Sequence, residues 1–185
     1  DGWLITGDLG RIDDDDYVFV TGRAKDVIIR GGHNIDPALI EEPLVQAPDV
    51  LIAAAVGKPD AHAGELPVAY VQLHPGATAT EAELLAVATA NIHERPAVPK
   101  EIIVLDQLPL TAVGKPQKHL LQLDAARRTF NDVFKGIQGD WTMDIEISGG
   151  GLLLKVAVPA DQQQSRREIE QILSGFAIRH QVSAV

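Results

Sequence analysis

Apolar and polar positions follow distinct patterns along the chain, and each pattern predicts an element. Residues 3–20 are predicted to form a β-hairpin, because "WLIT" and "YVFV" are rich in β-branched and aromatic side chains and "GRIDDDD" between them supplies turn residues. Short apolar runs predict buried strands at residues 27–29, 50–57, 68–73 and 101–105. The stretch "KPDAHAGELP" between the strands at 50–57 and 68–73 predicts a turn region.

Helical spacing separates several of these strands. An Asp-Pro pair at 36–37 predicts an N-cap and a first turn, and apolar residues continue the helix to about residue 46. These apolar residues are Leu39, Ile40, Leu44 and Val45. Thr80 and Glu83 have the spacing of a capping box and predict a second helix that ends near His93. A third helix is predicted from about residue 117 to residue 128.

The order of these elements predicts an α+β fold with three parts. The hairpin at residues 1–22 precedes a compact domain at 23–129, in which helices flank a three-stranded sheet. From residue 130 the pattern becomes "WTMDIEIS", "GGG" and "LLLKVAVP", followed by a helix with Ser165 and Glu168 at capping-box spacing. Residues 130–185 are therefore predicted to be a ββα(β) extension, for which packing, a homodimer contact or an accessory ligand site are open roles.

Composition restricts the partners and the cellular setting. The 185 residues are 45% hydrophobic and 23% charged, as in globular proteins, and the net charge of −10 repels nucleic-acid phosphates. The apolar run at 50–56 is too short to span a membrane. With no cysteine and no recognisable signal peptide, we expect a cytoplasmic protein. Because the chain begins at Asp1 and enters an apolar stretch at once, we expect it to be a segment of a longer protein.

Two groups of residues have side chains that can bind metals but lack the spacing of known metal sites. The acidic run at 13–16 lacks the alternating ligands and the distal glutamate of a calcium loop, so a solvated turn is predicted there. The six histidines show neither HxxxH nor HExxH spacing. We therefore predict no metal site in this chain.

Four longer blocks carry the strongest functional indication. "GWLITGDLGRID", "GRAKDVIIRGGHNIDPALIEE", "VGKPDAHAGELPVAYVQL" and "VPKEIIVLDQLPLTAVGKPQK" occur in this order. Together they resemble the adenylate-forming superfamily, which includes acyl- and aryl-CoA synthetases, adenylation domains of peptide synthetases and firefly-type luciferases. The resemblance extends to about residue 128 and covers only the end of such an enzyme. It implies the last hairpin of a large N-terminal domain followed by a small C-terminal lid.

The resemblance implies roles for the residues around the hairpin. Asp8 of "TGD" matches the aspartate that holds the ribose hydroxyls of ATP or AMP, and a carboxylate is a natural acceptor for such a diol. Arg23 matches an arginine near the ribose and phosphates of the nucleotide. Lys25 matches the hinge residue about which the lid rotates between two half-reactions.

The following glycine turn is implied to act in the second half-reaction. Gly31 and Gly32 match a turn that lines the pantetheine tunnel for CoA, where glycine permits close approach and positive φ. His33, which follows directly, is a residue that either borders this tunnel or only completes the turn. Without the flanking blocks, a tight strand-to-helix turn would explain both glycines equally well.

Lys115 matches the catalytic lysine of the first half-reaction. There its ammonium would stabilise the negative charge that builds up as a carboxylate attacks the α-phosphate of ATP. Pro116 departs from the aliphatic residue more common in the family, and it is expected to stiffen the loop or to start the next helix. "PLTAVGK" also resembles the site at which lysine acetyltransferases neutralise acyl-CoA synthetases, so an acetyltransferase acting on Lys115 is a further hypothesis.

The resemblance leads us to expect the mobile lid of an acyl-CoA synthetase. The whole enzyme would convert a carboxylic acid to an acyl-adenylate with ATP, using Mg²⁺ held mainly by the N-terminal domain, and would transfer the acyl group to CoA. The segment alone is expected to be inactive. A lid that serves the phosphopantetheine of a carrier protein is one alternative, although residues 130–185 show no carrier motif with its serine. A non-catalytic regulatory or interaction module is the other, and the presence of Asp8, Arg23 and Lys115 argues against it.

Overall fold

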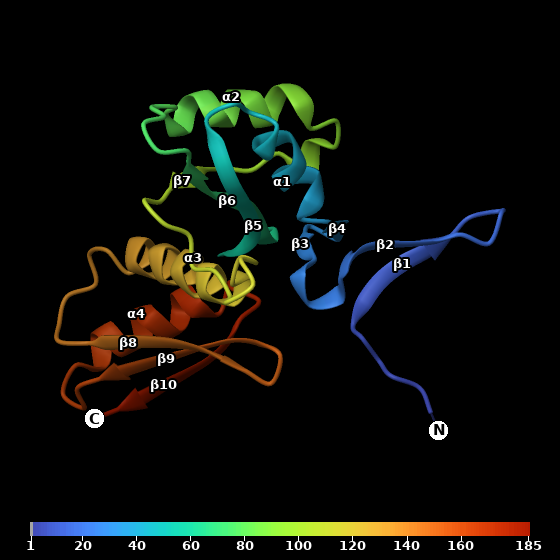
Figure 1. Cartoon of the computed structure of the whole chain (residues 1–185). Helices are drawn as coiled ribbons and strands as arrows, with labels where there is room; N and C mark the ends of the chain where they lie inside the picture. Colours follow the sequence, from blue (N-terminus) through green and yellow to red (C-terminus); the bar gives the residue numbers. More distant parts are fainter. Residues whose placement is uncertain (1) are drawn as a thin grey trace.

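The computed structural model describes residues 2–185; Asp1, the first residue of the predicted hairpin unit, lies outside the described residues. Two lobes share a long helix, and a β-hairpin projects from the first lobe (Figure 1). The hairpin consists of β1 (Asp8–Ile12) and β2 (Val18–Arg23). The elements of the first lobe are η1 (Ala24–Asp26), β3 (Ile28–Arg30), β4 (His33–Ile35), α1 (Ala38–Val45), β5 (Val50–Asp60), β6 (Gly64–Leu73), α2 (Glu81–Asn91), η2 (Arg95–Ala97), β7 (Ile102–Val104) and α3 (Lys118–Val133).

The hairpin forms, but its first strand lies further along the chain than predicted. The "WLIT" segment is not a strand, and Trp3 is 93% exposed. The turn decides the register: the Asp13 carboxylate accepts the backbone N–H groups of Asp15 and Tyr17, which places the paired residues directly on either side. β1 is therefore "DLGRI", whose last three residues fall in the predicted turn, whereas the solvated turn predicted at 13–16 is confirmed.

The sheet of the first lobe is buried on both faces, which explains its continuous apolar strands. Alternate side chains of β5 point to opposite sides: Ala53 and Ala55 pack in one core with α1 and α2, whereas Ala54 and Val56 pack in another with α3. The predicted three-stranded sheet corresponds to β5, β6 and β7. The strand predicted at 27–29 is β3, and together with β4, which was not predicted, it extends the sheet to the order β4-β3-β6-β5, with β7 also on β6. The α+β class is thus confirmed.

The predicted turn region at "KPDAHAGELP" is mostly strand. β5 continues to Asp60 and β6 begins at Gly64, so the turn is confined to residues 61–63. The ladder extends because Lys58 pairs with Leu66 in an antiparallel register. The Asp60 carboxylate accepts the N–H groups of both His62 and Ala63, which closes the turn and lowers the pKa of Asp60.

Local end signals placed the starts of the first two helices to within one residue. The Asp36 carboxylate accepts the N–H of Ala38 at 2.9 Å, in the first turn of α1, but the helix begins one residue later than predicted and Pro37, not Asp36, occupies its N-cap position. Thr80 and Glu83 form both hydrogen bonds of the capping box of α2. The third helix, α3, does not end at residue 128 but continues to Val133.

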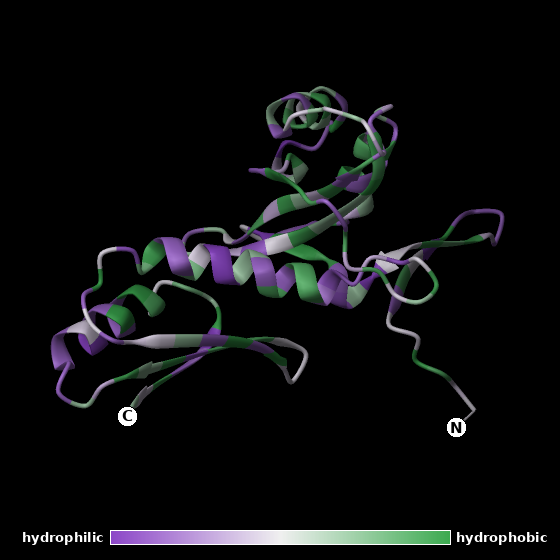
Figure 2. Ribbon diagram, turned by 60° about the vertical axis from the view of Figure 1, so that its left-hand side comes forward, coloured by the Kyte–Doolittle hydropathy of each residue, from purple (hydrophilic) through white to green (hydrophobic). Residues whose placement is uncertain are grey.

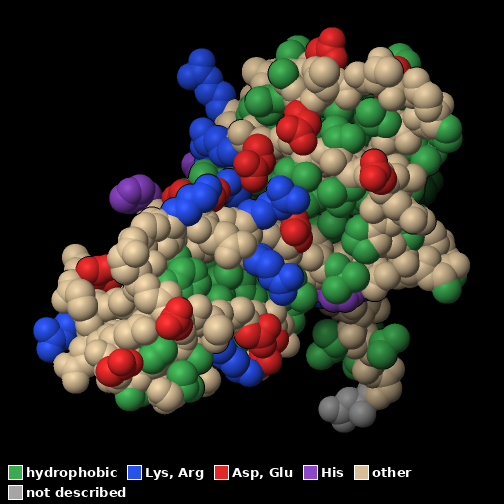
Figure 3. Space-filling view, turned by 90° about the vertical axis from the view of Figure 1, so that its left-hand side faces the viewer, with side chains coloured by type: hydrophobic (Ala, Val, Ile, Leu, Met, Phe, Trp, Pro, Cys, Tyr) green, Lys and Arg blue, Asp and Glu red, His purple; other side chains and the backbone are tan. Residues whose placement is uncertain are grey.

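Helix α3 belongs to both lobes, and the buried side chains along it change partner half-way. Leu121 and Ala125 pack against the large sheet, whereas Ala126 and Phe130 pack in the core of the second lobe. In Figure 2 this helix lies between the two layers of strands, and Figure 3 shows acidic and basic side chains mixed along the junction of the lobes. The predicted boundary between residues 129 and 130 falls inside this helix, and the division of the chain into domains stays a prediction.

The second lobe has the predicted ββα(β) order. It comprises β8 (Thr142–Ser148), β9 (Gly151–Val158), α4 (Gln163–Leu173) and β10 (Arg179–Ala184), with β10 parallel to β9 at one edge. The capping box predicted at Ser165 and Glu168 is wrong, because α4 begins earlier and the Ser165 hydroxyl donates to the Gln138 carbonyl at 2.7 Å. No helix within residues 2–185 is both long and apolar enough to cross a bilayer.

A hydrogen bond between Tyr70 and Asp124 fastens α3 to the large sheet. The Tyr70 side chain is fully buried on β6, and its hydroxyl donates to the Asp124 carboxylate at 2.8 Å. The same carboxylate accepts from Arg128 one turn further along α3, at 2.6 Å. Burial, reinforced by the negative charge of Asp124, raises the pKa of Tyr70 well above its usual range, so the phenol stays a donor.

We predict that Tyr70→Phe lowers the free energy of unfolding by about 1 kcal/mol, because it removes one hydrogen bond and leaves a partly exposed Asp124 that still pairs with Arg128. Urea unfolding followed by circular dichroism would measure the change. Tyr17→Phe on the exposed hairpin should have no effect. A Tyr70→Phe protein as stable as the original would show that the bond does not hold α3 in place.

Candidate functional site

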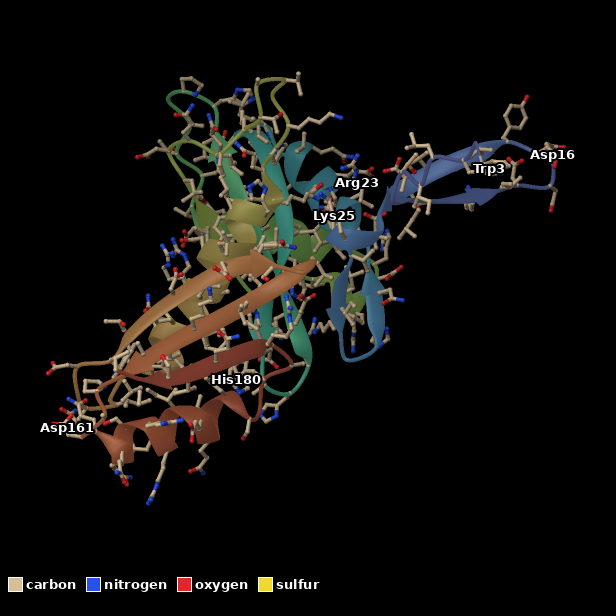
Figure 4. All side chains as sticks on the ribbon, turned by 90° about the horizontal axis from the view of Figure 1, so that it is seen from below. Trp3, Asp16, Arg23, Lys25, Asp161 and His180 are labelled. Atoms are coloured by element: carbon tan, nitrogen blue, oxygen red, sulfur yellow. The ribbon has the colours of Figure 1, made fainter. Side chains whose placement is uncertain are left out.

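The base of the projecting hairpin brings the first predicted site residues together. Asp8 and Arg23 face each other across the β1–β2 ladder, with 3.2 Å between the Arg23 Nε and the Asp8 Oδ1. Figure 4 places Arg23 and Lys25 side by side at this base, with Asp16 at the far tip of the hairpin. The ion pair is more than one-third exposed, so it adds little stability and leaves both groups accessible to a ligand.

Lys115 lies on a short closed loop before α3. Thr111 fixes this loop twice: its N–H donates to the Lys115 carbonyl at 2.8 Å, and its Oγ1 accepts the Lys115 N–H at 3.1 Å. Gly114 adopts a φ of +77°, a value that favours glycine, and this turns the chain sharply. Leu110 and Pro116 form a bridge at the base of the loop, so Pro116 closes it rather than starting the helix. The Lys115 side chain is exposed.

Arg23, Lys25 and Lys115 line one recess of about 570 Å³. Helix α3 contributes Lys118 and His119 to its wall, and the Lys118 ammonium is held by Glu41 at 2.8 Å. Arg23, Lys25, Lys115 and Lys118 face one lining carboxylate, Asp26, although Arg23 and Lys118 are themselves paired with Asp8 and Glu41. The remaining excess of positive charge differs from the net charge of −10 of the whole chain and favours an anionic ligand at this place. Three of the predicted site residues, separated by up to 92 positions in sequence, are thus brought to one surface.

The predicted glycine turn lies at the other end of β3. Gly31 and Gly32 have φ values of +55° and +85°, and a Cβ atom built on either would meet nothing within 4 Å. His33 is exposed and begins β4 opposite Arg30. None of Gly31, Gly32 and His33 lines the recess that contains Lys115. The first lobe therefore presents an ammonium and an open backbone turn at two separate places.

Sequence reasoning missed the contribution of the second lobe. The turn between β8 and β9 reaches Lys25, because Ile147 and Gly150 line the recess of Lys115 and also a second recess of about 400 Å³, and Lys25 lines both. Arg179 supports this turn by donating to the Gly151 carbonyl at 3.4 Å. The sequence "GGG" was predicted only as a loose turn, and nothing in it indicates which surface it meets.

Glu65 is a second residue that the sequence did not single out. It lines the recess of about 400 Å³ beside Lys25, and its carboxylate accepts the N–H of Ile29 at 2.8 Å. Burial raises the pKa of Glu65, although the hydrogen bond from Ile29 acts in the opposite direction. Its only sequence signal was its place between a glycine and a strand, which fits many surface glutamates.

Comparison with known proteins identifies the first lobe. Residues 39–115 match the family model of the AMP-binding enzyme C-terminal domain. This chain contains the C-terminal domain of an AMP-binding enzyme. The match ends at Lys115, the residue predicted from sequence to be catalytic.

Its relatives include several acid–CoA ligases. A marinolic acid–CoA ligase from Pseudoalteromonas sp. is 49% identical over 156 residues, covering 82% of this chain and 24% of the relative. The medium-chain fatty-acid–CoA ligase of Escherichia coli is 38% identical over 75% of this chain and 25% of the relative. The chain thus spans about a quarter of the length of these curated relatives.

Solved structures agree with this assignment. ATP-bound MatB from Rhodopseudomonas palustris has a TM-score of 0.60 and 38% identity, and the match covers 70% of this chain and 25% of that one. An amide bond synthetase, McbA from Marinactinospora thermotolerans, matches with a TM-score of 0.58 and 35% identity. The AMP-binding C-terminal domain therefore has the adenylate-forming fold that the sequence blocks predicted.

We predict that Lys115 reacts with acetic anhydride before Lys118 does. The Lys115 side chain is exposed, whereas the Lys118 side chain is only 20% exposed and its ammonium is paired with Glu41. Limited labelling followed by peptide mass spectrometry would give both rates, with the exposed Lys135 as the reference. Equal labelling of Lys115 and Lys118 would contradict the loop geometry.

Proposed function

We propose that this chain is the mobile lid of an acyl-CoA synthetase. The longer enzyme would activate a carboxylic acid with ATP to an acyl-adenylate and would then transfer the acyl group to CoA, whereas the segment alone would be inactive. The observation that carries this proposal is the recess at the hinge, where Arg23, Lys25 and Lys115 meet. The acid–CoA ligases among the relatives support the reaction class.

Lys115 would act in the first half-reaction. The attack of a carboxylate on the α-phosphate of ATP gathers negative charge on the phosphoryl oxygens, and an ammonium held there stabilises that charge. A closed loop presents Lys115 without burying it, so the lid can offer this group to a facing pocket. Asp8 and Arg23, already paired at the hairpin base, would hold the ribose and the phosphate end of the nucleotide.

The glycine turn would act in the second half-reaction. With open space around Gly31 and Gly32, the thin pantetheine arm of CoA could pass directly along the backbone. His33 would border this tunnel. Because this turn and Lys115 lie at different places on the lid, one position of the lid cannot offer both to the same nucleotide, and rotation about Lys25 would exchange them.

The N-terminal adenylation domain would cover the hairpin. Apolar side chains of the hairpin and of the segment before it are exposed to an extent that is unusual for a free surface. They are Trp3, Leu4, Ile5, Leu9, Ile12, Tyr17, Val18, Phe19 and Val20. The same domain would bind most of the Mg²⁺, since no group of three or more His, Asp or Glu side chains in residues 2–185 is arranged to hold a metal.

The acyl acceptor and the regulation of the lysine are further parts of the proposal. CoA is favoured over a carrier protein because the curated relatives act as CoA ligases. Acetylation of Lys115 by an acetyltransferase would remove the charge needed for adenylation, and the exposed loop would admit such an enzyme. A homodimer contact through the second lobe and a cytoplasmic location stay predictions.

The central test uses the full-length enzyme with Lys115→Ala and a panel of carboxylic acids. We predict that ATP–pyrophosphate exchange falls by about 100-fold or more, since the charge on the phosphoryl oxygens loses its counter-charge. Thioester formation from a supplied acyl-adenylate and CoA should remain near the original rate. Both reactions are followed separately by radiolabel exchange and by chromatography of the acyl-CoA.

Lys135→Ala is the matched control, because Lys135 is an exposed lysine at the far end of α3, paired only with Asp132. It should leave both half-reactions unchanged. If Lys115→Ala lowers both half-reactions equally, the assignment of the lysine to adenylation is wrong. If the original enzyme exchanges pyrophosphate with none of the acids, the proposed function itself fails.

A further inference from the structure

Strand β3 connects the hinge to the glycine turn, yet few ladder bonds hold it on the sheet. The outer edge of β6 is shared: β7 pairs with residues 69–71, and β3 is left with the single register pair Arg30–Gly64. One more backbone bond follows, from the Gly31 N–H to the Ala63 carbonyl at 2.7 Å. Three register pairs join β3 to β4, and Ile28 of β3 is buried in the core, but β4 is itself the edge strand. The placement of the β3–β4 pair against β6 therefore needs support from a further contact.

A side chain supplies this support. The Glu65 Oε2 accepts the Ile29 N–H at 2.8 Å, in the middle of β3, where a neighbouring strand would otherwise provide a carbonyl. Glu65 follows Gly64, the residue at which β3 and β6 meet, so its carboxylate continues the ladder by one bond. Ile29 is 55% exposed, so water competes for this N–H, and the bond acts by fixing the position of the strand and not by sparing a buried donor.

The space for the carboxylate is made by a glycine on the adjacent strand. A Cβ atom built on Gly57 of β5 would lie 2.5 Å from the Glu65 Oε2, closer than real side chains approach. Gly57 and Glu65 thus form a matched pair. Because Gly57 has ordinary extended backbone, its need for glycine comes from this contact and not from its φ angle.

The location of this contact gives it a functional meaning. The same side chain lines the recess that contains Lys25, so the carboxylate lies between the hinge and the turn at residues 31–32. Burial disfavours the charged carboxylate and raises the pKa of Glu65. This unfavourable burial occurs beside β3, the strand that leads to the glycine turn.

We propose that Glu65 is a positioning residue for thioester formation: it fixes β3, and through β3 the Gly31–Gly32 turn, relative to the hinge at Lys25. The inference rests on the proposed function, because it assigns a task to that turn. A turn that lines a ligand tunnel must be held to a fraction of an ångström, and a displacement of 1 Å can reduce a rate by about 100-fold. Adenylation, which uses the Lys115 loop, does not depend on this placement.

The test compares Glu65→Ala, Glu65→Gln and Gly57→Ala in the full-length enzyme. Glu65→Ala should lower kcat for thioester formation from supplied acyl-adenylate and CoA by about 10-fold to 100-fold, with ATP–pyrophosphate exchange unchanged. Glu65→Gln should restore the rate to within a few-fold, because the amide oxygen accepts the same N–H without the charge. Gly57→Ala should resemble Glu65→Ala, since the added methyl group displaces the carboxylate.

Glu81 offers a control with the same chemistry. Its Oε1 accepts the Val104 N–H at 3.1 Å, a carboxylate-to-strand bond on β7, which shares the edge of β6 but lies far along the chain from the hinge. Glu81→Ala should leave both half-reactions unchanged. Hydrogen–deuterium exchange of the peptide 27–33 should rise in Glu65→Ala, return in Glu65→Gln and stay low in Glu81→Ala.

Three outcomes would overturn the inference while the proposed function stands. The first is a Glu65→Ala enzyme that keeps its rate of thioester formation. The second is an equal loss in both half-reactions, which would indicate a general folding defect, and the third is a failure of Glu65→Gln to restore activity although peptide 27–33 is protected again. An original enzyme that forms no acyl-adenylate would instead refute the proposed function.

Discussion

The burial of helix α3 between two hydrophobic cores is the constraint on which the rest of the structure depends. Its first half completes the core beneath the large sheet through Leu121 and Ala125, and its second half completes the small lobe through Ala126 and Phe130. Burying one such large apolar side chain contributes roughly 1.5–3 kcal/mol. Moving the lobes relative to each other would expose one core or the other, so α3 joins them into a single body.

This shared helix also positions the chemistry. The loop of Lys115 leads directly into α3, and the small lobe, held by the other end of the helix, brings its β8–β9 turn to Lys25. A lobe that looks peripheral in sequence therefore forms part of the wall around Lys25. In the lid that we propose, the extension rotates with the sheet and limits the space into which the hinge can move.

The Lys115 loop and the Gly31–Gly32 turn are held in place by different kinds of contact. The Lys115 loop is closed by its own backbone and by Thr111, so its shape is determined by contacts within the loop. The glycine turn depends on β3, which pairs with β4 on one side but is joined to β6 by one register pair, the Gly31–Ala63 bond and the Glu65 carboxylate. In the lid that we propose, alternation between these groups would require movement at Lys25 and a strand β3 that keeps its place immediately after it.

The sequence patterns predicted correctly those features that depend on residues near one another in the chain. They failed where contacts between residues far apart in the chain determine the structure. Thr80 and Glu83 cap a helix by bonds across three residues, so the pattern sufficed, whereas Ser165 bonds a carbonyl 27 positions away and its pattern misled. The strand at β1 was misplaced because the turn at Asp13, and not the apolar "WLIT", sets the register. The family blocks predicted roles for Lys115, Lys25 and the two glycines, but only the folded chain brings Lys115 and Lys25 to one recess and places the glycines elsewhere.

The role of Glu65 could not be predicted from the sequence. Its bond to Ile29 spans 36 positions and leaves no periodic pattern, and its matching glycine is understandable only when the strands are paired. The same holds for the β8–β9 turn, whose glycines predict a turn and nothing about its neighbour.

The most direct test of the account is the distance between the lobes during the catalytic cycle. Cysteines introduced at His93 and Asp161, which are both exposed and lie on different lobes, would carry spin labels in the full-length enzyme. Pulsed electron paramagnetic resonance would then measure the distance between the two labels. The account predicts one narrow distance distribution that is the same with ATP bound and with acyl-adenylate plus CoA. A distribution that broadens or shifts between these states would contradict a lid and an extension joined rigidly by α3.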